Sequence, residues 1–190
     1  YASLRTAGAI ERSELALVLF DASVALTEQD LRILTMVEET GRALVIVMNK
    51  WDLVEKETNT AIQFEKELKQ RLAPFNDVPI LFVSALEKLR IHKAIEVALK
   101  VVENRKRKIS TAELNEVMLK AIASYHPPVV RGHPIKIKFI TQLPTAVPSF
   151  AFFCNFPDDI KTPYKNYLEN QLRDQYDFCG VPVRIFFRKK

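Results

Sequence analysis

Asn49, Lys50 and Asp52 are the residues whose types and spacing best suit chemistry, and they follow an apolar run from Ala43 to Met48. The side chain of Asn49 can hydrogen-bond a purine base, and the stem of Lys50 can lie over the face of that base. Asp52 can accept hydrogen bonds from a ring N1–H and from an exocyclic amine. Because guanine offers both donors on one edge and adenine does not, the spacing predicts a site that reads guanine.

A second loop supports this prediction. The apolar segment Pro79–Val83 ends at Ser84, Ala85 and Leu86. In guanine-nucleotide domains such a loop lies beside an Asn-Lys-x-Asp motif, and its backbone N–H faces the guanine carbonyl. Loops at the carboxyl ends of neighbouring parallel strands form the ligand crevice of an open α/β sheet. The alternative is two ordinary strand-to-helix turns in which Asn49 and Ser84 cap the helices that follow.

A phosphate-binding loop is missing from the sequence. Hydrolysis of GTP needs a loop such as GxxxxGK[ST], whose backbone N–H groups and lysine contact the phosphates. The four glycines, Gly8, Gly41, Gly132 and Gly180, do not form this spacing. We therefore expect the chain to begin inside a nucleotide-binding domain, with the phosphate loop and the Mg²⁺ ligands upstream of Tyr1. The chain by itself is predicted to be inactive toward GTP.

Composition sets the broad class. A chain of 190 residues that is 48% hydrophobic can form one core or two small ones, and no apolar run approaches the length of a membrane span. Cys154 and Cys179 lack CxxC spacing, which indicates reduced thiols and a cytoplasmic protein. The three histidines, His92, His126 and His133, are not spaced as metal ligands.

Positive charge is concentrated in the second part of the chain. Residues 1–108 carry 17 basic and 16 acidic side chains, and residues 109–190 carry 11 and 7. Such an asymmetry favours a polyanionic partner, RNA, although a solvated charge run is the alternative. The candidate RNA contacts are Arg105, Lys106, Arg107, Lys108, Lys136, Lys138, Arg184 and Arg188, with Lys189 and Lys190 at the end of the chain.

The elements that must position the guanine-reading loops alternate between strand and helix. Continuous apolar runs predict buried parallel strands at Leu15–Phe20, Ala43–Met48 and Pro79–Val83. Helices are expected at Ser3–Glu14, after a capping box at Thr27, at about residues 59–72, and from Ile91 to the basic run. This order predicts an α/β domain over residues 1–108, with a parallel sheet covered on both sides.

Residues 109–190 have a different pattern. Ser110 caps a helix, and the period changes to two from Ile135, so that Ile135, Ile137 and Phe139 face one way while Lys136 and Lys138 face the other. An aromatic-rich strand at Ser149–Phe156, a helix at Thr162–Gln175 and a strand at Val183–Phe187 complete an α-β-β-α-β order. This order predicts a small α+β domain, in which Phe150, Phe152, Phe153 and Phe156 either pack in the core or stack on bases.

These stretches together resemble the EngA/Der family, bacterial GTPases with two tandem Era-like G domains and a C-terminal KH-like domain. The similarity covers essentially the whole chain. It is carried by Tyr1–Thr6, Ala9-Ile10, Asp21–Ser23, Thr27–Asp30, Gly41–Val45, Asn49–Asp52, Ser84–Leu86, Pro127-Pro128, Arg131-Gly132, Ile135–Phe139, Thr141-Gln142, Tyr164-Lys165, Tyr167–Gln171, Pro182 and Arg184-Ile185.

The resemblance implies that residues 1–108 are the C-terminal portion of a second G domain and that residues 109–190 are the KH-like domain. It implies GTP or GDP as ligand with Mg²⁺, GTPase activity of the full-length protein, and a role in assembly of the large ribosomal subunit. The guanine contacts would be Asn49, Lys50, Asp52, Ser84, Ala85 and Leu86.

The implied partners are the large ribosomal subunit with its rRNA and the first G domain of the same chain, in a cytoplasmic monomer. The KH-like half lacks the GxxG loop that clamps RNA in ordinary KH domains. The alternative is therefore a non-hydrolysing RNA or ribosome interaction module, in which the G-domain portion is only a scaffold.

Overall fold

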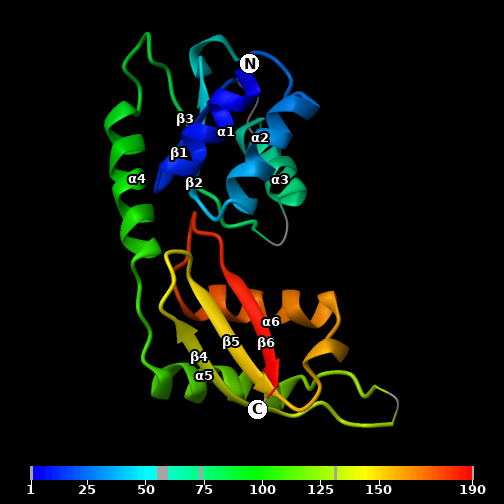
Figure 1. Cartoon of the computed structure of the whole chain (residues 1–190). Coiled ribbons are helices and arrows are strands. Elements are labelled where there is room, and N and C mark those ends of the chain that lie inside the picture. The colour runs from blue at the N-terminus through cyan, green and yellow to red at the C-terminus, as the bar shows by residue number, and fades with distance from the viewer. Residues whose placement is uncertain (1, 55–59, 73–74, 131, 190) are drawn as a thin grey trace. The chain divides into compact units, whose positions relative to one another are not determined.

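The computed structural model describes residues 2–54, 60–72, 75–130 and 132–189, without the side chains of residues 2–5, 67 and 71. The chain divides into two compact units, which are drawn in Figure 1. Unit 1 contains the residues up to Arg105 together with Phe178–Pro182, and unit 2 contains Lys106–Asp177 and the residues from Val183 on. The sequence analysis placed the division after residue 108 and assigned residues 178–182 to the second domain.

Unit 1 is built on a parallel sheet of β1 (Leu15–Asp21), β2 (Ala43–Asn49) and β3 (Ile80–Phe82), in that spatial order. The central strand, β2, is buried from Ala43 to Met48. Its side chains therefore contact apolar groups on both faces, which explains why its sequence is continuously hydrophobic. The register pairs Asp21 with Asn49, so the carboxyl ends of β1 and β2 lie level with each other.

Helices cover both faces of this sheet (Figure 1). They are α1 (Ala2–Arg12), α2 (Glu28–Glu39), α3 (Thr60–Arg71) and α4 (Ile91–Arg105). Leu44, Ile46 and Met48 belong to one apolar cluster with residues of α2 and α3, and Val45 and Val47 belong to a second cluster with Val101 of α4. The predicted α/β class is confirmed. No helix in the described ranges has the length and apolarity that crossing a membrane requires.

The start of α2 shows how the sequence sets an element boundary. The Thr27 hydroxyl accepts a hydrogen bond from the Asp30 backbone N–H, and the Asp30 carboxylate accepts one from the Thr27 N–H at 2.8 Å. This reciprocal pair is the predicted capping box, and it satisfies two backbone donors that a helix N-terminus leaves unpaired.

The segment Phe178–Pro182 is an integral part of unit 1. The Leu44 N–H donates to the Gly180 carbonyl at 2.8 Å, and the Asn104 side-chain amide donates to the Cys179 carbonyl at 3.3 Å. Gly180 has a φ of +72°, and a Cβ there would lie 2.8 Å from a methyl group of Val101 and 2.9 Å from the Leu44 carbonyl oxygen. Only glycine fits this close approach without displacement of its neighbours.

Unit 2 is an α+β fold. Its elements are α5 (Thr111–Ser124), β4 (Ile137–Leu143), β5 (Ser149–Cys154), α6 (Thr162–Gln175) and β6 (Arg184–Lys189). The sheet has the order β4-β5-β6, with β4 antiparallel and β6 parallel to β5. Buried side chains of α5 and α6, among them Leu114, Met118 and Leu168, face the sheet core. The predicted α+β order is confirmed.

One predicted orientation in unit 2 is wrong. A β-bulge lies between Ile137 and Phe139, because the pairing register with β5 shifts there. The extra residue reverses the alternation of the strand. Ile137 and Ile140 are therefore buried, and Phe139 is 39% exposed instead of facing the core with Ile137. Phe150 and Phe152 are fully buried, which confirms core packing for these two aromatics.

Candidate functional site

The carboxyl end of β2 turns sharply at Lys50. This residue has φ +61° and ψ +34°, a left-handed conformation that few residues other than glycine adopt. A short 3₁₀ helix, η1 (Trp51–Leu53), follows directly. The Trp51 ring is buried 4.3 Å from the Phe82 ring, and its backbone N–H donates to the Val83 carbonyl at 3.0 Å. These two contacts fasten the turn to the end of β3.

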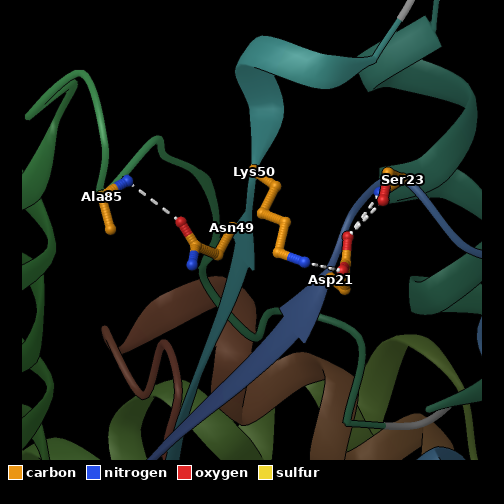
Figure 2. Close-up of polar contacts among 5 residues, drawn as sticks. All are labelled: Asp21, Ser23, Asn49, Lys50 and Ala85. Carbon is orange, nitrogen blue, oxygen red and sulfur yellow. Dashed lines mark hydrogen bonds and ion pairs between the residues drawn. The ribbon is translucent and has the colours of Figure 1, made fainter.

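The structure brings the two predicted loops together. The backbone N–H of Ala85 donates to the side-chain oxygen of Asn49 at 3.1 Å, as Figure 2 shows. Ser84 is fully buried, and its hydroxyl accepts a hydrogen bond from the Glu87 N–H at 3.1 Å. Ser84 therefore shapes the loop from inside, whereas Leu86 is 86% exposed. The Ala85 N–H is thus directed toward the edge of the sheet where Asn49 lies.

Asp52 has an unsatisfied acceptor. One of its carboxylate oxygens, Oδ1, is buried and has no hydrogen-bond partner among the described residues. A buried acceptor left unpaired costs about 1–3 kcal/mol, so such groups in native proteins generally serve a ligand or a water. A ligand that offers N–H groups at this position would remove that cost, which is the role the sequence predicts for Asp52.

The sequence analysis did not single out Asp21. Its carboxylate lies at the carboxyl end of β1 and accepts from the Lys50 ammonium at 2.6 Å (Figure 2). The backbone N–H and the hydroxyl of Ser23 donate to the other oxygen at 2.9 and 2.6 Å. These bonds, the one from Lys50 first, lower the pKa of Asp21 to about 2, and the same pair raises the pKa of Lys50.

The four basic residues 105–108 differ in their burial and in their hydrogen bonds. Arg105 is buried, and its guanidinium donates to the Gly41 carbonyl within unit 1. Desolvation by burial lowers the pKa of Arg105. Arg107 donates to the Asp177 carbonyl at 3.2 Å, while Lys106 and Lys108 are exposed. Arg105 is therefore occupied in the packing of unit 1 and does not form part of an accessible basic surface.

The other candidate RNA contacts lie in unit 2. Lys136, Lys138 and Arg188 are exposed, and Arg184 is partly exposed. Lys136 and Lys138 line a cavity of about 370 Å³ with His126 near the end of α5. Arg184 and Arg188 lie on β6, on the opposite side of β5 from β4.

Comparisons with known proteins agree with this architecture. The family model described as the elongation factor Tu GTP binding domain matches residues 2–128, and the model described as the KH-domain-like of EngA bacterial GTPase enzymes, C-terminal, matches residues 108–188. A GTPase Der of Flavobacterium johnsoniae is 47% identical over 190 residues, and one of Christiangramia forsetii is 48% identical over 190 residues. In both cases all of this chain is covered, and the chain spans 44% of the length of the relative.

A solved structure of Era in complex with MgGDPNP and nucleotides 1506–1542 of 16S ribosomal RNA also matches. It is 16% identical, has a TM-score of 0.42, and is aligned over 97% of this chain and 67% of that chain.

The α/β unit with its Asn-Lys-x-Asp loop and the α+β unit that follows it in the sequence define a GTP-binding-domain protein with a KH-like C-terminal part. Within that class, the chain belongs to the EngA/Der family of GTPases.

Proposed function

We propose that unit 1 is the guanine-reading part of a GTPase. The observation that carries this proposal is the buried, unpartnered Oδ1 of Asp52 beside the Asn49–Ala85 contact. Asp52 would accept the N1–H and amine of guanine, and the Lys50 stem would lie over the ring. The Ala85 N–H, which donates to the Asn49 side-chain oxygen in this structure, would exchange that acceptor for the guanine carbonyl on binding. Ser84 and Leu86 would shape and flank the loop.

The same proposal assigns hydrolysis to the full-length protein. The phosphate loop is absent from residues 1–190, and the described residues contain no group of three or more His, Cys, Asp or Glu side chains that could hold a metal ion. We propose that the ligands of Mg²⁺ lie, with the phosphate loop, in the part of the full-length protein upstream of Tyr1. In-line attack on a γ-phosphate depends on positioning and charge stabilisation by such groups, so residues 1–190 alone would not turn over GTP.

The test separates base recognition from hydrolysis. Isotope-labelled chain is titrated with guanosine, inosine and adenosine while the amide signals of Asn49, Asp52 and Ala85 are followed by NMR. Guanosine should bind at least about fivefold more tightly than adenosine, since two hydrogen bonds of about 0.5–1.5 kcal/mol each distinguish the two bases. Inosine lacks the exocyclic amine and should fall between them. Equal affinity for guanosine and adenosine would contradict guanine recognition by unit 1. Measurable GTP turnover by a pure sample of residues 1–190 would contradict the assignment of catalysis to upstream residues.

The proposed biological role is a switch in assembly of the large ribosomal subunit, in a monomeric cytoplasmic protein whose first G domain precedes this chain. Support comes from family membership and from the basic side chains of unit 2.

A second candidate function, an RNA or ribosome interaction module without hydrolysis, is favoured by the same side chains. RNA binding through phosphate contacts should weaken steeply with salt. Replacement of exposed Lys106 and Lys108 by glutamine should reduce the salt slope by about one per contact.

A further inference from the structure

One face of the sheet of unit 2 carries exposed aromatic side chains at its two outer strands, while Ser149 and Ala151 on its central strand are buried. Residues paired across neighbouring strands point to the same face of a sheet. The register gives three such rows on this face: Phe139–Phe153–Arg188, Thr141–Ala151–Phe186 and Leu143–Ser149–Arg184. We call these nine residues the open face.

Exposure distinguishes the open face from the face that packs in the core. On the core face, Ile140, Phe150 and Phe152 are fully buried. On the open face, Phe139 is 39% and Phe186 is 45% exposed. Large exposed aromatic rings on a regular sheet gain little by remaining in water, so their position on this face calls for a partner.

The aromatic rings form a platform. Phe139 and Phe153 lie with their ring centroids 5.5 Å apart. Phe186 projects from β6 in the next row, where its neighbour on β5 is the small Ala151. Ala151 itself is fully buried, so the exposed apolar surface of this part of the sheet belongs to the rings of Phe139 and Phe186. Planar bases stack on such rings with about 1–3 kcal/mol per base, whatever the sequence.

The charge of these strands favours a polyanion. β4, β5 and β6 carry Lys138, Arg184, Arg188 and Lys189 and contain no aspartate or glutamate. Arg188 is paired in register with Phe153, which places a cation beside the aromatic platform. Rings flanked by cations match the alternation of bases and phosphates in a nucleic acid strand.

We propose that the open face is a binding surface for single-stranded RNA, with bases stacked on Phe139 and Phe186 and phosphates held by Arg188. The inference rests on the RNA partner proposed above and names the surface and the RNA form that it takes. The GxxG loop, which this chain lacks, has no part in it. Duplex RNA cannot use the platform, because its bases are already stacked on one another.

The experiment measures the affinity of the whole chain for a fluorescein-labelled, unstructured 12-nucleotide RNA at low salt. The variants are Phe139→Leu and Phe186→Leu, which keep an apolar side chain but remove the stacking ring. The matched control is Phe156→Leu, because Phe156 belongs to the same unit, is 38% exposed and lies outside the open face. Thermal melts establish that each variant is folded.

Each open-face variant should raise Kd by at least about fivefold, the lower end of the stacking range converted to affinity, and the control should stay within twofold of the wild type. Arg188→Gln should lower the salt slope by about one. RNA that contains 5-iodouridine should cross-link on irradiation to peptides that contain Phe139 or Phe186. A duplex of the same length should bind equally to the wild type and to both phenylalanine variants.

The possible failures are distinguishable. If the wild-type chain binds no RNA at low salt, the proposed RNA partner is wrong, and the inference falls with it. If the wild type binds RNA but Phe139→Leu and Phe186→Leu bind equally well, only the inference is wrong.

Discussion

Asp21 and Lys50 form an ion pair of 2.6 Å that joins the ends of two neighbouring strands, β1 and β2. The pair matters because Lys50 follows Asn49 directly, at a turn where its backbone is left-handed. Ser23 in turn holds the Asp21 carboxylate in place. We infer that Asp21 positions the lysine stem for the guanine face.

Removing this pair should weaken base binding without unfolding unit 1. Asp21→Asn keeps the size of the side chain and its contact with Ser23, but releases Lys50. Because exposed ion pairs make small contributions, the Kd for guanosine should rise by only roughly two- to fivefold. Asp21→Glu should recover part of the affinity. An unchanged Kd in Asp21→Asn, measured by NMR titration, would show that the pair does not position Lys50 for the base.

The Asp21 carboxyl should titrate unusually low. Its pKa is about 2 in the folded chain against an ordinary value of 3.8, chiefly because of the hydrogen bond from Lys50. Since the folded pKa is the lower one, the pair stabilises the fold above about pH 4, and this contribution is lost as the pH falls toward 2. Carboxyl ¹³C NMR should place the midpoint near 2. In Lys50→Met the midpoint should move up toward 3.8, and a midpoint near 3.8 in the wild type would contradict the pair.

Asp52→Asn should change which base is preferred. The carboxylate accepts two donors, whereas an amide at the same position offers a donor and an acceptor. Guanosine should lose at least about tenfold in affinity, and xanthosine, which has a carbonyl where guanine has the amine, should gain relative to it. Titration of the wild type and of the variant with both nucleosides measures the change in their relative affinities for guanosine and xanthosine. Parallel loss of both would mean that the substitution damaged the loop instead.

Gly180→Ala should destabilise unit 1 strongly. Its Cβ would contact Val101 and the Leu44 carbonyl oxygen at under 3 Å, and its φ is +72°. Gly132 is a matched control, because its φ is +77° but nothing lies within 4 Å of a Cβ there. Gly132→Ala should lower the free energy of unfolding by about 1–2 kcal/mol, because alanine disfavours the left-handed conformation. Gly180→Ala should lower it by a further ~1–3 kcal/mol, because the added methyl group overpacks the site. Urea denaturation of both variants tests the difference, and equal losses would remove the role assigned to the close approach.

Much of the fold is readable from sequence because its signals are local. β2 is predictable because a strand buried on both faces must be apolar throughout, and α2 because Thr27 and Asp30 form its cap. Asn49 and Asp52 are also recognisable from the sequence, because they lie three residues apart at the end of a buried strand and this spacing itself predicts a guanine site.

The features that were missed depend on pairing between distant segments. Asp21 becomes part of the site only because the register of β1 on β2 sets it level with Asn49. Phe139 turns outward because of a bulge that a period-two pattern cannot reveal. The burial of Arg105 requires Gly41, which lies far away in sequence, to present its carbonyl.

The position of Phe178–Pro182 also determines how often the backbone passes between the two units. The backbone crosses between the units after Arg105, after Asp177 and again after Pro182. A cut within residues 106–177 would therefore leave both fragments anchored in unit 1. The Leu44–Gly180 hydrogen bond joins this segment to β2, the strand whose far end carries Asn49. The residues that lead into β6 are therefore held by the central strand of unit 1.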